Sequence, residues 1–164
     1  MAGQAEIKAK LAELKVLSPS GYALALHIRY TTPTFLFQTY EKKWLDHYSQ
    51  NGYVMTDPAV HWGFENRGSR TWAELADLDV AGVFKAAAEH GLKYGIACAV
   101  GEDASPSICA FARPDREFTQ AETDEIMGHL HEMHALTDNL QALSPETAAA
   151  LKEMSILYTH PAND

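Results

Sequence analysis

Residues 94–113 read Tyr94-Gly-Ile-Ala-Cys-Ala-Val-Gly-Glu-Asp-Ala-Ser-Pro-Ser-Ile-Cys-Ala-Phe-Ala-Arg113, and the class of fold follows from them. Two runs of small and β-branched residues, 94–100 and 108–113, flank a segment rich in Gly, Ser, Asp and Pro. This pattern predicts a β-hairpin. A hairpin joins antiparallel strands, whereas parallel strands need a longer crossover. We therefore expect an antiparallel sheet with helices packed on its faces.

The segments around this hairpin predict two further strands and four helices. Strands are expected over residues 22–30 and 34–37. Helices are expected over residues 5–17, 40–50, 79–90 and 120–140, the last opened by the capping box Thr119-Gln-Ala-Glu122. The resulting order of helix, two strands, two helices, two strands and helix indicates a mixed α/β (α+β) domain.

The first expected strand alternates with a period of two between Tyr22 and Tyr30. Its large apolar residues, Ile28 among them, fall at even positions and therefore on one face of the strand. His27 and Arg29 fall on the other face. This pattern is typical of a half-buried strand.

The composition describes one soluble globular domain. The chain has 164 residues, 46% of them hydrophobic, and its 13 Lys and Arg against 22 Asp and Glu give a net charge of −9. This acidity argues against direct binding of nucleic acid or of an anionic membrane surface. No apolar run is long enough for a membrane span and residues 1–10 lack a signal peptide's apolar core, so we expect a cytoplasmic protein. Cys98 and Cys109 fit buried thiols in a reducing compartment.

Aromatic residues and one Asp-Pro pair form the most informative set in the chain. Tyr40, Trp44 and Tyr48 recur every four residues, an Asp-Pro pair begins at Asp57, and Trp72 follows 15 residues later. Alone, such an aromatic stripe indicates core packing, and an Asp-Pro pair indicates a turn. Together, indole and phenol donors with a carboxylate acceptor suit a ligand that carries carbonyls and an amide N–H.

This set, with Tyr53 between Tyr48 and Asp57, resembles the ligand-binding domain of LuxR-type quorum-sensing receptors, which bind N-acyl-homoserine lactones. The resemblance extends through Gly91-Leu-Lys-Tyr-Gly95 and the last expected helix. It implies an α-β-α sandwich with a central antiparallel sheet and the ligand between sheet and helices. It also implies a signal sensor for transcription regulation rather than an enzyme, with no cofactor and no catalytic residues.

The resemblance implies a role for each polar residue of the set. Trp44 would donate to the lactone carbonyl, Asp57 would accept from the ligand amide N–H, and Tyr40 would donate to the acyl carbonyl. Tyr48 and Trp72 would wall the pocket. The expected neighbours of the acyl chain are Leu36, Val83, Phe84, Tyr94 and Ile96.

Three residues depart from the pattern of this family. Leu45 stands where some relatives carry Arg. Ala97 and Ala112 stand where some relatives carry Thr or Ser that help bind a 3-oxo group or the acyl carbonyl. These two alanines are further candidate lining residues, and we expect no preference for a 3-oxo substituent.

The domain is expected to span residues 5–140, followed by a C-terminal extension over 141–164 without a helix-turn-helix domain. Ser144 followed by Pro145 predicts a helix start in this extension. As partners we expect a small-molecule signal and a second copy of the chain, with a full-length receptor as an alternative. The sequence leaves two other functions open, a sensor for another amide or aromatic ligand and a zinc lactonase.

The lactonase alternative depends on three histidines near the end of the last expected helix. His129, His131 and His134 resemble the zinc motif of lactonases, but Met133 replaces its Asp. On a helix, positions i and i+2 point in divergent directions, so His129 and His131 would not share one ion. A solvated helix face is the preferred interpretation, and no metal site is expected.

Overall fold

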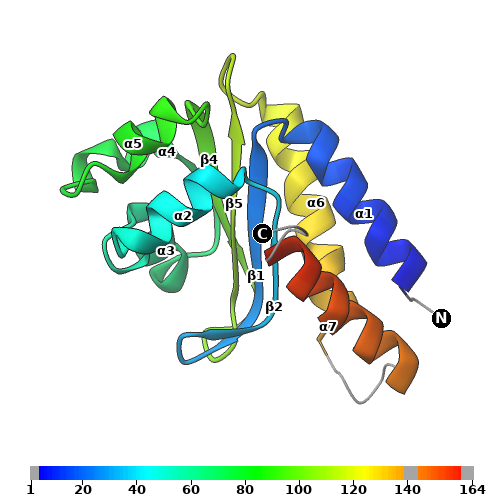
Figure 1. The fold of residues 1–164 in the computed structure, drawn as a ribbon. Helices are drawn as coiled ribbons and strands as arrows, with labels where there is room; N and C mark the ends of the chain where they lie inside the picture. Colours follow the sequence, from blue (N-terminus) through cyan, green and yellow to red (C-terminus); the bar gives the residue numbers. More distant parts are fainter. Residues whose placement is uncertain (1–3, 139–143, 160–164) are drawn as a thin grey trace.

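The computed structural model describes residues 4–138 and 144–159, and its centre is a five-stranded sheet (Figure 1). The strands are β1 (Gly21–Arg29), β2 (Thr32–Gln38), β3 (Gly68–Thr71), β4 (Tyr94–Val100) and β5 (Ser107–Arg113). Their spatial order is β2-β1-β5-β4-β3, and every neighbouring pair is antiparallel. The hairpin predicted over residues 94–113 is present as β4 and β5, so the prediction of an antiparallel sheet is confirmed.

Helices cover both faces of this sheet, as Figure 1 shows. One face carries α1 (Gln4–Leu17), α6 (Gln120–Leu136) and α7 (Pro145–Thr159). The other carries α2 (Lys42–Gln50), α3 (Pro58–Glu65), α4 (Trp72–Leu75) and α5 (Val83–Glu89), with the 3-10 turns η1 (Tyr53–Met55) and η2 (Ala76–Leu78). This arrangement is the α-β-α sandwich that the resemblance implies.

Local hydrogen bonds shift some of the predicted boundaries. The helix expected over 79–90 begins only at Val83, because the Asp79 carboxylate accepts hydrogen bonds from the backbone N–H groups of Val83 and Phe84 at 2.8 and 2.9 Å. The short edge strand β3 was not predicted. The helix start at Ser144 is present, whereas the expected boundary at 140 lies outside the described residues.

The two faces of the sheet carry side chains of different size. Toward α1 and α6 the side chains are mostly large, and they form a closed hydrophobic core. This face holds Tyr22, Leu24, Leu26, Ile96, Cys98, Cys109 and Phe111. Both cysteines are buried free thiols, as expected, and they lie opposite each other in β4 and β5. Toward α2–α5 the strands present mainly alanine, which leaves room between the sheet and those helices.

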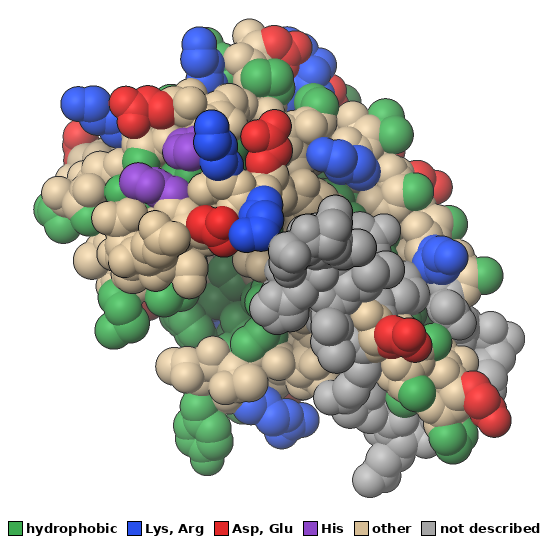
Figure 2. Space-filling view, viewed as in Figure 1, with side chains coloured by type: hydrophobic (Ala, Val, Ile, Leu, Met, Phe, Trp, Pro, Cys, Tyr) green, Lys and Arg blue, Asp and Glu red, His purple; other side chains and the backbone are tan. Residues whose placement is uncertain are grey.

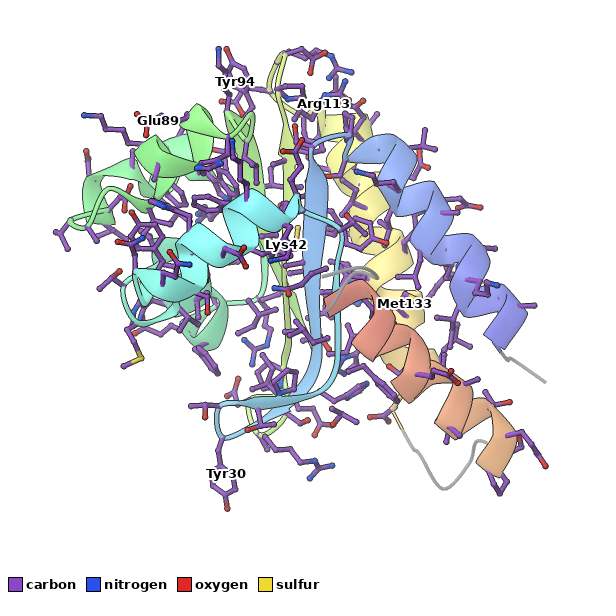
Figure 3. All side chains as sticks on the ribbon, in the orientation of Figure 1. Tyr30, Lys42, Glu89, Tyr94, Arg113 and Met133 are labelled. Carbon is purple, nitrogen blue, oxygen red and sulfur yellow. The ribbon has the colours of Figure 1, made fainter. Side chains whose placement is uncertain are left out.

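Strand β1 changes the direction of its side chains at His27. Leu26 packs in the core beside α6. His27 has a φ of 52°, and its buried ring also turns toward α6, where it stacks on His134 with ring centroids 4.0 Å apart. Ile28 therefore packs on the opposite face, and the predicted strict alternation is wrong at this point. Tyr30 projects from the tip of the β1–β2 hairpin and is 97% exposed (Figure 3).

The capping box predicted at Thr119 is confirmed. The Thr119 hydroxyl accepts from the Glu122 N–H, and the Glu122 carboxylate accepts from the Thr119 N–H at 2.8 Å. Arg116 adds a bidentate contact to the same carboxylate, at 2.8 and 2.9 Å. The Arg116 guanidinium and the Thr119 N–H lower the pKa of Glu122 from 4.5 to about 2.

We expect Glu122→Gln to destabilise the fold by about 1 kcal/mol near neutral pH, a value limited by solvent screening. Because the pKa of Glu122 is lower in the folded state, its contribution is present above 4.5 and is lost as the pH falls toward about 2. Urea unfolding across this range should therefore show a steeper acid loss in wild type than in Glu122→Gln. Glu125→Gln, on the same helix, should behave like wild type, and equal acid profiles for all three proteins would contradict the prediction.

Candidate functional site

A cavity of about 670 Å³ lies between the sheet and the helices α2, α3 and α5. Figure 2 shows it at the surface as a hollow walled by hydrophobic side chains. Its floor is the alanine-rich face of the sheet, and its described lining includes Ala23, Ala25, Ile28, Pro33, Leu45, Val60, Phe64, Ala87, Ile108 and Ala110. Val54, Met55 and Phe64 lie along the cavity and are 52%, 75% and 41% exposed. The cavity thus has an exposed apolar rim.

The structure brings most of the predicted site residues to this cavity. Its lining contains Tyr40, Trp44, Tyr48, Asp57, Trp72, Leu36, Val83 and Phe84. Ala97 and Ala112 pack in the same hydrophobic cluster as Tyr40 and Trp44, from the sheet side, but do not line the cavity.

Tyr94 and Ile96 lie elsewhere, which corrects their expected place beside the acyl chain. Side chains alternate along β4, so Ala97 faces α2–α5 while Ile96 packs in the core on the α6 side. Tyr94 begins β4 at the upper end of the sheet in Figure 3, and it is absent from the described lining.

Asp57 is held in place by the helix that it starts. It is the N-cap of α3, with Pro58 at the first helical position, and its Oδ1 accepts from the Ala59 N–H at 2.9 Å. Its Oδ2 accepts from the Tyr48 hydroxyl at 2.7 Å. Asp57 is only 9% exposed, so this carboxylate is a fixed acceptor inside an apolar cavity.

Burial sets the protonation of these polar groups. It raises the pKa of Asp57, an effect that the hydrogen bonds from Tyr48 and Ala59 partly oppose. Burial beside Asp57 also raises the pKa of both Tyr40 and Tyr48, which keeps the two phenols protonated. Both are therefore hydrogen-bond donors, and the Tyr40 hydroxyl donates to the Ala110 carbonyl of β5 at 3.2 Å.

Aromatic rings enclose this end of the cavity. Trp44 packs edge-on against Tyr48, with centroids 5.7 Å apart, and lies 6.1 Å from Tyr53 and 5.4 Å from His90. Trp72 stacks on Phe84 at 5.0 Å, with an angle of 7° between the rings. Two indoles, two phenols and one carboxylate therefore gather in an apolar enclosure. In the free chain the phenols donate to the Ala110 carbonyl and to Asp57.

A family model described as an autoinducer binding domain matches residues 21–142, which is most of the chain. The chain belongs to the autoinducer binding domain family. Members of this family are signal-binding receptor domains. No curated protein sequence matches the chain.

Solved structures show that this autoinducer binding domain shares its fold with LuxR-type regulators. Escherichia coli SdiA matches with a TM-score of 0.66 and 20% identity over 90% of this chain and 64% of that chain. SdiA in complex with octanoyl-rac-glycerol matches with a TM-score of 0.63 and 18% identity over 85% and 63%. The chain thus spans slightly less than two thirds of these SdiA chains.

A third structure is CepR2 from Burkholderia cenocepacia, described as an N-acylhomoserine lactone dependent LuxR family transcription factor. It matches with a TM-score of 0.58 and 14% identity over 84% of both chains. At such identities the likeness shows the fold. None of the helices in the described part of this autoinducer binding domain combines the length and apolar character that a membrane crossing requires.

The alanines that form the floor of the cavity in this autoinducer binding domain were not predicted from the sequence. Ala23 and Ala25 alternate with the large residues of β1, and Ala110 precedes the buried Phe111 in β5. The signal was visible in the sequence as a strand face of alanines opposite a face of large residues. Ile28 had no such signal, because the change of direction at His27 brings it to the cavity.

Proposed function

We propose that this domain binds an N-acyl-homoserine lactone in the cavity beneath α2 and signals by binding, without chemical change of the ligand. The observation that carries the proposal is the buried Asp57 carboxylate, which lies with the Trp44, Tyr40 and Tyr48 rings at one end of an otherwise apolar cavity. The family of signal-binding domains to which the chain belongs supports it.

The ligand's polar groups have partners at that end of the cavity. An acyl-homoserine lactone offers one amide N–H donor and two carbonyl acceptors, so it needs one acceptor and at least two donors from the protein. Asp57 is the acceptor for the amide N–H, and Trp44 is the donor for the lactone carbonyl. The Tyr40 hydroxyl, which donates to the Ala110 carbonyl in the free chain, turns to donate to the acyl carbonyl when the ligand binds. Because burial holds the phenols protonated, Tyr40 remains a donor throughout the physiological pH range.

The acyl chain runs from this polar end along the sheet. Ile28 and Ile108 belong to a second apolar cluster on the same face, and both line the cavity, as does the exposed Phe64 at the rim. Apolar groups along this path gain free energy in proportion to the area that they bury. The fold's relatives support an acyl ligand, because one SdiA structure holds octanoyl-rac-glycerol and CepR2 is described as acylhomoserine lactone dependent.

We further propose that the domain acts in the cytoplasm as a sensor in transcription regulation, within a longer regulator or as a modulator of one. It is not proposed as an enzyme. The histidines of the lactonase alternative have different surroundings. His129 pairs with Glu13 at 3.0 Å, His131 is exposed, and His134 stacks on His27. A homodimer, or a heterodimer with a full-length receptor, is the proposed assembly.

A thermal melt with a ligand panel tests the proposal. At about 100 times Kd, a matching lactone should raise the melting temperature by roughly 5–10 °C, because binding to the folded state alone stabilises it by about 2.7 kcal/mol. The panel contains lactones of several chain lengths, each beside its ring-opened acyl-homoserine and octanoyl-glycerol. A shift with octanoyl-glycerol alone would replace the lactone by another acyl ligand, and no shift with any compound would refute the function.

A further inference from the structure

A second cluster of polar side chains lies on the α6 side of the sheet, away from the cavity. It consists of His27 from β1 with His134 and Asp138 from the end of α6, and one donor atom from each lies within 4.8 Å of the other two. We propose that His27, His134 and Asp138 bind a divalent transition-metal ion of the zinc class, with solvent completing the coordination.

Hydrogen bonds already fix the orientation of both imidazole rings. The His27 Nε2 contacts the His134 carbonyl at 2.9 Å, and a carbonyl only accepts, so this nitrogen carries the proton. Nδ1 of His27 therefore has the free lone pair, and it lies 3.7 Å from Asp138 Oδ1. His134 Nδ1 lies 2.7 Å from the Ser107 hydroxyl, and Nε2 is the ligand atom in the tautomer whose Nδ1–H donates to that hydroxyl. Metal-binding histidines typically have such a partner on the second ring nitrogen.

The spacing suits a metal after a small movement. Ligands in a tetrahedral zinc site lie about 3.3 Å from one another, given bonds of about 2.0–2.1 Å. The 3.7 Å between His27 and Asp138 is close to this value. Asp138 can move, because its side chain is 69% exposed while that of His27 is only 6% exposed. The His134 ring must also tilt out of its stack on His27, because two nearly parallel rings direct their lone pairs side by side and not to one point.

The backbone of β1 is arranged to present His27 at this place. A positive φ is uncommon for residues other than glycine, and His27 adopts 52° while its N–H donates to the Ser107 hydroxyl at 3.0 Å. This conformation turns the ring out of the alternation of the strand and onto His134. An uncommon backbone conformation of this kind is concentrated at functional sites.

The surrounding charges are compatible with a bound cation. Arg67 is a permanent positive charge near His134. The Arg67 guanidinium is bonded to the Gly63 and Gly101 carbonyls and to Asp103, and Asp138 supplies the anionic ligand.

Titration of the metal-free, untagged chain with Zn²⁺, and with Co²⁺ as a spectroscopic probe, tests the site. Wild type should bind one ion per chain and show the visible absorption of low-coordinate Co²⁺. Asp138→Asn should weaken binding at least tenfold, and His134→Gln should remove the cobalt spectrum. His131→Asn, on the same helix but exposed, should bind like wild type. Melting curves of each protein without metal establish that the variants fold.

Two results would overturn the proposal. One is the absence of saturable Zn²⁺ or Co²⁺ binding by folded wild type. The other is binding that Asp138→Asn and His134→Gln leave unchanged, which would assign the ion to other histidines, such as the neighbouring His47 and His90. Acyl ligands take no part in this experiment, so its failure is independent of the proposed sensor function.

Discussion

Asp57→Asn is expected to weaken binding of the preferred acyl-homoserine lactone by about ten- to a hundredfold. A hydrogen bond to a charged group contributes about 1.5–3 kcal/mol, and asparagine removes the charge of the only carboxylate in the described lining of the cavity. Asparagine keeps one oxygen, which remains available to the Ala59 N–H at the start of α3. The substitution therefore separates the loss of the ligand's acceptor from the loss of the helix cap.

Stability of the free chain provides the internal control for Asp57→Asn. Burial raises the pKa of Asp57 in the folded state, so ionisation of this residue lowers stability as the pH rises above its ordinary value of 3.8. The neutral amide of the variant carries no such penalty, and we expect the free variant to be at least as stable as wild type near neutral pH. Calorimetric titration with the lactone measures affinity, with Asp46→Asn on the exposed face of α2 as the matched variant. Unchanged affinity in Asp57→Asn would contradict the assigned role.

Gly95→Ala is expected to destabilise the fold by about 2–3 kcal/mol and to abolish ligand binding with it. A Cβ at position 95 would lie 2.1 Å from Cδ2 of Trp72, whose indole packs directly on this glycine. Movement of the indole away from position 95 would disturb its stack with Phe84, whose ring centroid lies 5.0 Å away. Overpacking of this kind usually costs about 1–3 kcal/mol. Urea unfolding followed by tryptophan fluorescence measures the loss.

Gly128→Ala is the matched variant for this prediction. Gly128 lies within α6, and a Cβ there has no atom within 4 Å, so alanine should stabilise the helix by about 0.5–1 kcal/mol. Opposite signs for the two Gly→Ala substitutions are the expected result. A Gly95→Ala variant as stable as wild type would show that the indole of Trp72 has room to shift. This result would contradict the tight packing of Trp72 on Gly95.

Local signals in the sequence predicted much of the fold. The Gly101–Ser107 turn between two short apolar runs predicted the β4–β5 hairpin, and Thr119 with Glu122 predicted the start of α6. Both depend on neighbours in the chain. The edge strand β3 depends instead on pairing with β4, which is distant in sequence. The four residues of β3 alone do not predict this contact.

The sequence predicted which residue types form the candidate site better than it predicted the directions in which their side chains point. Asp57 and the aromatic residues were found through their types and spacing, and the structure gathers them around one cavity. Ile96 and Ala97 were both expected at the ligand, although neighbouring strand residues point to opposite faces. The grouping of His27 with His134 and Asp138 was not predicted, because His27 reaches α6 through a positive φ that breaks the alternation of the strand.

The alanine floor of the sheet has a consequence for the abundance of the protein in a cell. Ala23, Ala25 and Ala110 are too short to reach the helices across the cavity, so a ligand seated there supplies apolar contacts that side chains supply elsewhere. The side chains of the protein thus supply only part of its hydrophobic interior. Proteases degrade chains through their open forms, and a ligand that completes the interior makes these forms rarer. The concentration of the signal would therefore set the lifetime of its own receptor domain.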